Sequence, residues 1–245
     1  MLLELDGLVL GQLVLLGLFG LCNGTVGERT RLSSSVNLDD IYPASRSERK
    51  RRAILAAGET LFLEHGYLGT TMDEIAALAV VSKQTVYKHF VDKERLFIEI
   101  VTTTVNEISD PVADEVLQLQ HSERVEEDLR RLAVTLLTRV MQPRLLALRR
   151  LVIGESGRFP ELGRAFYERG PGRTIATLAV VFETLAGRGA LVLDDPRAAA
   201  GQFNWLVMSA PINRAMLLGS LEPPADLDAI AAIGVAAFLA AYSPR

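Results

Sequence analysis

Residues 71–90, TMDEIAALAVVSKQTVYKHF, carry the strongest structural signal in the chain. Thr71 and Glu74 form a T-x-x-E capping box, which predicts a short helix over residues 72–79. Ser82 is a good N-cap for a second short helix that runs to Phe90. Two short helices joined by a tight turn, the second of them polar and basic, indicate a helix-turn-helix.

The second of these helices divides into a buried side and an exposed side. Val86 and Phe90 lie four residues apart and are expected to anchor the helix to a core. The polar residues around them are left facing outward: Lys83, Gln84, Thr85, Tyr87, Lys88 and His89. Such side chains suit a major groove, because glutamine pairs with adenine edges, threonine touches bases, and lysine reaches phosphate or guanine.

Further helices are predicted on both sides of this motif. The run from Arg46 to His65 has apolar residues at helical spacing, and Gly66 fits its C-terminal end. Asp92 is expected to cap another helix, which begins at Lys93 and turns an apolar side inward. Lys93 would then lie in a first turn whose free backbone N–H groups favour a phosphate.

The charge distribution separates this segment from the rest of the chain. The 245 residues have a formal net charge of −4, which by itself weighs against a nucleic-acid partner. Residues 45–95 nevertheless hold nine basic and seven acidic side chains, including all four lysines, whereas residues 96–245 hold 15 arginines and 18 acids. A basic module on an acidic body points to nucleic acid or to a membrane surface.

Together these residues resemble the DNA-binding domain of the TetR family. The resemblance covers about fifty continuous residues, 52–97, and includes ILAA at 54–57, TTM at 70–72 and VSKQTVYKHF at 81–90. It implies a three-helix head whose third helix reads DNA, and a fourth helix that leads into a ligand-binding body. By motif position it also implies phosphate contacts from Thr71, Tyr87, His89 and Lys93, and base contacts from Lys83, Gln84 and Thr85.

One position departs from the family pattern. The family usually has a glycine in the turn before the Val-Ser pair, where this chain has Val80. If that position needs a positive φ, a β-branched residue is strained there by about 1–3 kcal/mol. The geometry of the turn is open at this stage.

The remainder of the chain is predicted to be helical, because it contains no strand alternation of any length. Helices are expected over residues 123–141, 144–156, 160–169, 173–188, 196–218 and 226–242. The predicted fold class is therefore all-α. A three-helix helix-turn-helix head occupies residues 45–95, and a helical ligand-binding and dimerisation body occupies residues 96–245.

The last predicted helix is apolar on every side and rich in alanine. Such a helix requires burial on more than one side. We expect a homodimer in which the last two helices of each chain form a four-helix contact; burial inside a monomer is the alternative.

A second resemblance lies in the body. Residues 149–162, RRLVIGESGRFPEL, with AFY at 165–167 and GPGR at 170–173, resemble the C-terminal domain of the AefR-like branch of the TetR family. This resemblance implies a homodimeric effector domain, in regulators often associated with efflux or membrane-linked functions.

A ligand pocket in the body would be lined by apolar and aromatic side chains with a few polar groups. The candidates are Phe159, Phe166, Tyr167, Phe182, Asn204, Trp205 and Met208. For each of them alone, a place in the core is the commoner role. Arg149, Glu155 and Arg158 are interpreted as paired surface charges.

No pattern in the sequence indicates catalysis or metal binding. The three histidines (His65, His89 and His121) are not at metal-ligand spacing, and neither a phosphate-binding loop nor a G-x-S-x-G motif occurs. The single cysteine, Cys22, excludes a disulfide framework. We therefore expect no enzyme activity, no cofactor and no metal.

Residues 1–44 fit neither the head nor the body. Residues 8–21 form a nearly uninterrupted apolar run, which as a helix would span about 21 Å, short of a hydrocarbon core of roughly 30 Å. Glu4 and Asp6 precede it, where a secretory signal carries positive charge. Three interpretations stay open: a disordered or non-functional leader, a loosely attached apolar arm, and a membrane anchor.

The sequence thus predicts a cytoplasmic homodimer that binds a double-stranded DNA operator, most simply a repressor released by a small molecule. A ligand that prefers another arrangement of the body would move the fourth helix and spoil the spacing of the two reading helices, about 34–36 Å in a DNA-bound dimer. The alternatives are a membrane-tethered helical interaction protein that uses residues 8–21 and a sequence-nonspecific DNA-packaging protein.

Overall fold

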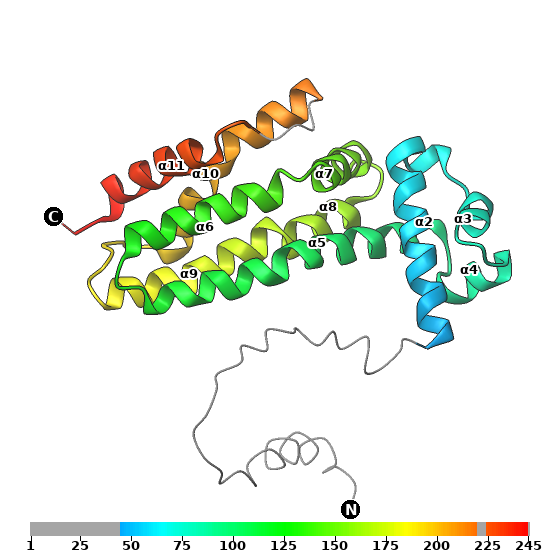
Figure 1. Cartoon of the computed structure of the whole chain (residues 1–245), viewed down its shortest axis with the longest axis horizontal. Coiled ribbons are helices and arrows are strands. Elements are labelled where there is room, and N and C mark those ends of the chain that lie inside the picture. The colour runs from blue at the N-terminus through cyan, green and yellow to red at the C-terminus, as the bar shows by residue number, and fades with distance from the viewer. Residues whose placement is uncertain (1–44, 220–223, 245) are drawn as a thin grey trace, which may run out of the picture. The chain divides into compact units, whose positions relative to one another are not determined.

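The computed structural model describes residues 45–219 and 224–244, and this part of the chain is built from helices without strands (Figure 1). The all-α prediction is confirmed. The helices are α2 (Arg46–Gly69), α3 (Met72–Leu78), α4 (Lys83–His89), α5 (Lys93–Gln118), the 3-10 turn η1 (Leu119–His121), α6 (Val125–Val140), α7 (Pro143–Glu155), α8 (Pro160–Arg169), α9 (Pro171–Gly187), α10 (Pro196–Leu218) and α11 (Leu227–Tyr242). None of these helices is long and apolar enough to cross a bilayer. The apolar run 8–21 lies outside the described residues.

Side-chain caps fix the helix boundaries where the sequence predicts them. Thr71 and Glu74 form the complete capping box of α3, while Ser82 accepts a hydrogen bond from the N–H of Thr85 and Asp92 from that of Arg95. At Gly66 the backbone turns to φ 73° and ψ 173°, so the regular helix that began at Arg46 ends there, as expected. The local signals of residues 45–95 therefore agree with the fold that they form.

One expected boundary differs by two residues. The helix predicted from residue 123 begins at Val125, because Ser122 does not cap it. The Ser122 hydroxyl instead donates to Asp128 Oδ2 at 2.6 Å and accepts from the N–H of Arg124 at 3.1 Å. These bonds hold the Ser122 side chain beside the segment before α6, so it is not available to cap the helix.

The head consists of α2, α3 and α4 packed on the first half of α5. Ile54, Ile75, Val86 and Phe97 are fully buried in its core. At Gly58 a Cβ atom would lie 2.8 Å from Ile100 Cδ1, so the glycine allows α2 and α5 to approach closely. The two helices therefore pack closely at this point.

Two hydrophobic cores share the long helix α5. The first lies in the head, includes α5 as far as Ile108, and also takes side chains from α7 and α8 such as Leu148 and Phe166. The second begins at Val112 and lies among α6, α9, α10 and α11, which pack against one another (Figure 1). Pro111 stands between the two cores and deprives α5 of one backbone hydrogen bond. The predicted head–body boundary at residue 95 falls inside this continuous helix.

Helices α10 and α11 pack at a close crossing. A Cβ atom on Gly234 of α11 would lie 3.1 Å from the carbonyl oxygen of Leu206 and 3.1 Å from Cα of Val207, both on α10. Phe238 packs nearby against Phe182 and Phe203, with ring centroids 5.1 and 5.2 Å away. The glycine therefore sets the distance between these two helices.

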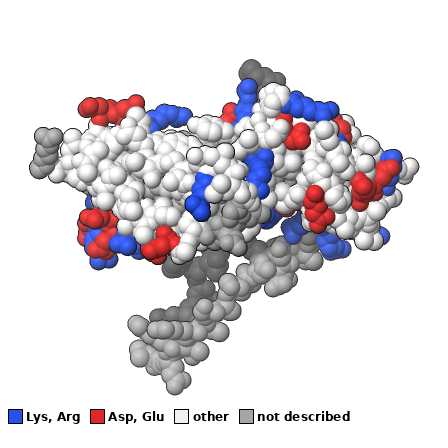
Figure 2. All heavy atoms as spheres, turned by 90° about the horizontal axis from the view of Figure 1, so that it is seen from above, with Lys and Arg blue, Asp and Glu red and all other residues white. Residues whose placement is uncertain are grey.

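The outer side of α10 and α11 is exposed and largely uncharged. Figure 2 shows a broad surface without Lys, Arg, Asp or Glu on the side of the molecule where these two helices lie. The exposed large apolar residues of these two helices are Trp205, Leu206, Leu217, Leu218 and Ile233, and Ile233 is 72% exposed. We call this surface the α10–α11 face. Because Ile233 lies open, the alternative of burying α11 on every side within a monomer is wrong.

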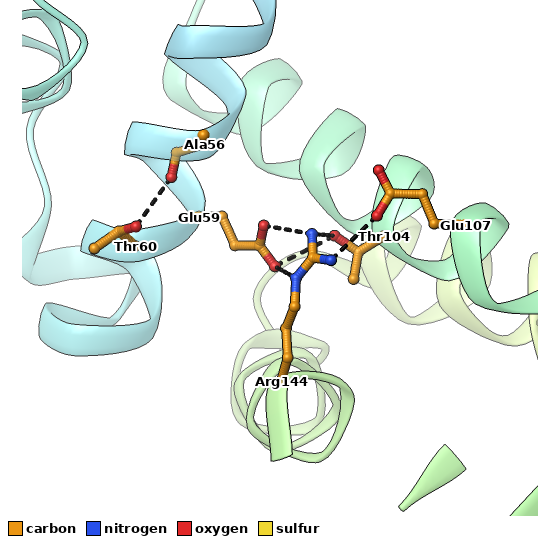
Figure 3. A network of polar contacts seen from close by, with 6 residues as sticks. All are labelled: Ala56, Glu59, Thr60, Thr104, Glu107 and Arg144. Carbon is orange, nitrogen blue, oxygen red and sulfur yellow. Dashed lines mark hydrogen bonds and ion pairs between the residues drawn. The ribbon is translucent and has the colours of Figure 1, made fainter. Parts of the chain in front are cut away.

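Arg144 at the start of α7 connects the head to the body. Its guanidinium donates to both carboxylate oxygens of Glu59 on α2, from Nε at 2.6 Å and from Nη2 at 2.7 Å (Figure 3). It also reaches Glu107 and Thr104 on α5, at 3.1 and 3.2 Å. The hydrogen bonds with Glu59 raise the pKa of Arg144 above its ordinary value. One side chain thus joins three helices.

Candidate nucleic-acid interface and internal pocket

Helix α4 presents its polar residues to solvent because its apolar residues hold it to the head. Val86 is fully buried and Phe90, at the C-cap, is 3% exposed. The predicted DNA contacts on this helix lie on the other side: Lys83, Gln84, Tyr87 and Lys88 are exposed, and Thr85 and His89 are half-buried. The structure therefore makes this row of donors and acceptors available to a groove.

Two of these side chains already have polar partners. The Nζ of Lys83 lies 2.8 and 3.0 Å from the carboxylate oxygens of Asp73 on α3, and this hydrogen bond raises the pKa of Lys83. The hydroxyls of Thr85 and Ser82 lie 2.8 Å apart. Gln84, between Lys83 and Thr85 in the sequence, is exposed, and its side-chain amide can pair with a base edge.

Thr71 is exposed at the N-terminus of α3. Its hydroxyl donates to Glu74 Oε2 at 2.7 Å and accepts from the backbone N–H of Glu74 at 3.2 Å. The bond from the Thr71 hydroxyl holds the pKa of Glu74 below its usual range. Thr71 therefore contributes to the helix cap, and its predicted phosphate contact stays a prediction.

Lys93 has a structural role that sequence reasoning missed. Its Nζ donates to the carbonyl oxygens of Tyr67 and Thr70, each at 2.8 Å, and lies 4.4 Å from the centroid of the Tyr67 ring. Burial, and then the charge of Arg158, lowers the pKa of Lys93. Two of its three N–H groups thus fasten α5 to the end of α2, which leaves one for a phosphate.

Val80 settles the question that the sequence left open at the turn. Its φ is 54°, and in the described part of the chain it is the only non-glycine residue with a positive φ. The N–H of Val81 reaches the carbonyl of Ala76 at 3.0 Å, so the turn is a left-handed helix end of the kind that glycine favours. The side chain is 90% exposed, and no packing offsets the backbone strain.

We expect Val80→Gly to raise the free energy of unfolding by about 1 kcal/mol, because glycine adopts this φ without steric cost. The measurement is urea unfolding followed by circular dichroism. Val91→Gly is the matched control, since Val91 is equally open at 79% exposure but does not have a positive φ. The control is expected to lose stability. A loss at both positions would show that Val80 is not strained.

A pocket lies in the body, between the two hydrophobic cores. Ile108 and Val112 of α5, Leu145 of α7 and Ile212 of α10 are among its walls. Four of the side chains predicted to line a ligand site reach it: Phe166, Asn204, Trp205 and Met208. The pocket is thus bordered by helices that also pack against the head.

The other three predicted side chains lie elsewhere. Phe159 packs edge-on against Tyr67, with ring centroids 4.6 Å apart, and Tyr167 is 54% exposed. Phe182 is fully buried among the phenylalanines of the second core. A ligand in this pocket would not touch these three residues in the structure as it stands.

Arg149 was missed as a pocket residue. It lines the pocket from α7, and its Nε is buried without a hydrogen-bond partner. The interpretation of Arg149 as a paired surface charge is wrong, because no carboxylate in the described part of the chain pairs with it, and burial lowers the pKa of Arg149. The helical spacing of Leu145, Arg149 and Val152 was the available signal, since it places the arginine on the buried side of α7.

Comparisons with known protein families agree with this division of the chain. Residues 54–100 match the model of the bacterial regulatory proteins of the tetR family, and residues 127–244 match the C-terminal domain of AefR-like transcriptional repressors. The first match covers the helix-turn-helix and the start of α5, and the second covers most of the body.

Individual solved structures extend the similarity to about four fifths of the chain. A solved structure of a TetR-family transcriptional regulator from Mesorhizobium loti MAFF303099 is 40% identical, covers 82% of this chain and 100% of its own, and superposes with a TM-score of 0.76. The flavonoid-responsive regulator FrrA is 35% identical, covers 80% of this chain and 98% of its own, and gives a TM-score of 0.64.

The curated relatives match over a shorter stretch. The uncharacterised HTH-type transcriptional regulator YhgD of Bacillus subtilis (strain 168) is 44% identical over 69 residues, which is 28% of this chain and 36% of YhgD. With the helix-turn-helix in place and a relative of known fold matched over its full length, the chain belongs to the TetR family of transcriptional regulators, with a body of the AefR-like type.

Proposed function

We propose that this regulator is a repressor that binds its operator as a homodimer and is released by a small molecule. The observation that carries the proposal is the position of α7. Leu145 of α7 lines the pocket, and its neighbour Arg144 holds Glu59 of the head. A ligand that displaces α7 therefore acts on a helix that binds α2 of the head.

The path from pocket to head passes through packed side chains. Phe166 of α8 lines the pocket and belongs to the head core, and Val105 and Ile108 of α5 do the same. Widening the pocket would shift these residues relative to α2 and so tilt α4. A ligand that binds the widened body more tightly draws the population away from the DNA-competent arrangement.

The α10–α11 face supports the dimer. A stable partner is needed to cover exposed apolar residues such as Ile233 and Leu217, and a second copy related by a twofold axis presents the same surface. The two copies of α4 must then lie about 34–36 Å apart to enter successive major grooves.

The description of a similar protein also supports the proposal that the effector is a small molecule. FrrA, which shares 35% of its residues with this chain, is described as a flavonoid-responsive regulator. The same arrangement of a helix-turn-helix head and a helical body therefore serves a ligand-responsive protein.

Selection of bound fragments from a random DNA library tests the proposal. A homodimeric repressor is expected to recover palindromic sites whose half-sites are separated by about one helical turn, and to hold them against excess random DNA. A DNA-packaging protein would be displaced by the random DNA. A chain that starts at Val36 is expected to keep operator binding; its loss would favour the membrane-tethered alternative.

Gln84→Ala is expected to relax the preference at one base position of each half-site, by about 1–3 kcal/mol of discrimination, because an exposed amide can pair with an adenine edge. The selection experiment, repeated with the variant, measures this directly. Tyr87→Phe is the control: it removes only the hydroxyl predicted to touch phosphate and should weaken all sites alike. An unaltered base preference in Gln84→Ala would exclude the base contact.

A further inference from the structure

The walls of the internal pocket have a distinctive charge pattern. Among the 17 lining residues of the described chain, two are arginines, Arg139 and Arg149, and none is an aspartate or a glutamate. Most of the other walls are apolar, including Ile108, Val112 and Met208. A cationic ligand would meet like charge here with no carboxylate to receive it, so the pocket disfavours cations.

Arg149 lines the pocket with a buried Nε that has no hydrogen-bond partner. Of the neighbouring arginines on α7, Arg144 binds Glu59, and Arg150 donates from Nη2 to the carbonyl of Ala215, although the Nε of Arg150 is also buried without a partner. Arg149 only lies over the ring of Phe166, 5.0 Å from its centroid, with its Nε buried and unbonded. A buried Nε–H without an acceptor costs free energy that an anionic oxygen placed beside it would recover.

Asn204 adds an independent donor on the wall formed by α10. Its side chain is 2% exposed, and its Nδ2 has no hydrogen-bond partner in the structure. Buried amide groups are normally paired. Two unsatisfied donors, one on α7 and one on α10, therefore line a single apolar pocket.

We propose that the effector is an amphipathic anion: an apolar body that fills the pocket and one anionic oxygen group that accepts hydrogen bonds from Arg149, with Asn204 as a second donor. This inference rests on the proposed function, in which the pocket receives the effector. The free volume inside the pocket is about 40 Å³, which is room for few water molecules. A ligand larger than that must widen the pocket, whose walls include α7 and α10.

The test uses two dyes with the same ring system, the anion 8-anilinonaphthalene-1-sulfonate and the neutral N-phenyl-1-naphthylamine. Both fluoresce in apolar sites. Trp205 is the only tryptophan of the chain and lines the pocket, so energy transfer from it reports dye bound near the pocket. Because Trp205 is also partly exposed on the α10–α11 face, the Arg149 variant below is needed to assign the bound dye to the pocket. The full chain is expected to bind the anionic dye about 10-fold or more tightly than the neutral dye, as expected for a charge-assisted hydrogen bond.

Arg149→Met keeps the apolar stem and removes the charge. We expect it to abolish the preference for the anionic dye while it retains the neutral one, which shows that the pocket is still formed. Arg150→Met is the matched control, because Arg150 is the next residue on α7 but is not among the pocket residues. Equal affinity for both dyes in the unmodified protein, or an unchanged preference in Arg149→Met, would overturn the inference.

The same samples separate this inference from the proposed function. Release of labelled operator is followed by fluorescence anisotropy while each dye is added. If the anionic dye binds through Arg149 but leaves the operator bound, the inference stands and ligand release fails. If both dyes release the operator equally from the unmodified protein, ligand release stands and the requirement for an anion fails.

Discussion

Ile233→Asp is expected to turn the dimer into a folded monomer and to lower operator affinity by about 100-fold or more. Ile233 is 72% exposed on α11, so the single chain tolerates a carboxylate there. In a twofold dimer through the α10–α11 face, two such carboxylates would be buried near each other without partners, at a cost of several kcal/mol. A monomer holds one half-site only and loses the second set of contacts.

Light scattering after size-exclusion chromatography gives the mass in solution, and anisotropy of labelled operator gives the affinity. Val180→Asp is the matched control, because Val180 is a 58% exposed β-branched residue on α9, outside this face. The control is expected to remain dimeric and to bind operator normally. A dimeric Ile233→Asp protein would show that another surface mediates the contact.

Gly234→Leu is expected to destabilise the fold by about 3 kcal/mol, because the crossing of α10 and α11 has no room for a side chain. Even a Cβ atom there would lie 3.1 Å from Cα of Val207 and from the carbonyl oxygen of Leu206. Backbone atoms cannot move aside as a side-chain end can, so the two helices must separate. Dimerisation should weaken as well, since both helices form the α10–α11 face.

Thermal or urea unfolding measures the effect. Gly154→Ala is the control within another helix: Gly154 lies in α7, and a Cβ atom there would meet nothing within 4 Å. That substitution is expected to stabilise the protein by about 0.5–1 kcal/mol, because alanine restricts the unfolded chain more than glycine does. A Gly234→Leu protein as stable as the unmodified one would mean that the crossing adapts.

The head could be predicted almost completely from the sequence, because its signals are local. The capping box of Thr71 and Glu74 and the caps at Ser82 and Asp92 each act within three or four residues. The spacing of Val86 and Phe90 likewise decides which side of α4 is buried. The conformation of Val80 was left open by the sequence, since the family pattern only marks the position as one where glycine is usual, and the structure gives it a positive φ.

The contacts that join α5 and α7 to α2 could not be predicted, because they connect residues far apart in the chain. Arg144 binds a carboxylate 85 residues earlier, and Lys93 binds backbone carbonyls 23 and 26 residues earlier. Every residue has a backbone carbonyl oxygen, so no sequence pattern identifies which carbonyl will accept a hydrogen bond. Lys93 was therefore interpreted only by its position in a helix N-terminus.

The pocket residues could be predicted only in part, because the pocket forms between helices that are far apart in the sequence. Phe166, Asn204, Trp205 and Met208 have the composition of a ligand site, and they do line the pocket. Phe182 is also aromatic and buried, but it belongs to the closed second core. Helical periodicity shows that a residue is buried, and it does not distinguish a core residue from one that lines a pocket. Contact of any of these residues with a ligand stays a prediction.

The sharing of α5 between two cores bears on how such regulators can be recombined. A chimera cut at residue 95 would join a foreign body to a head whose core needs Leu148 and Phe166 from that body. The head would then lose part of its own interior, so transplanting the DNA specificity alone calls for exchanging side chains on α4 within the intact chain. The same sharing implies that head and body melt in one cooperative transition, because neither core is complete without the helix that runs through both.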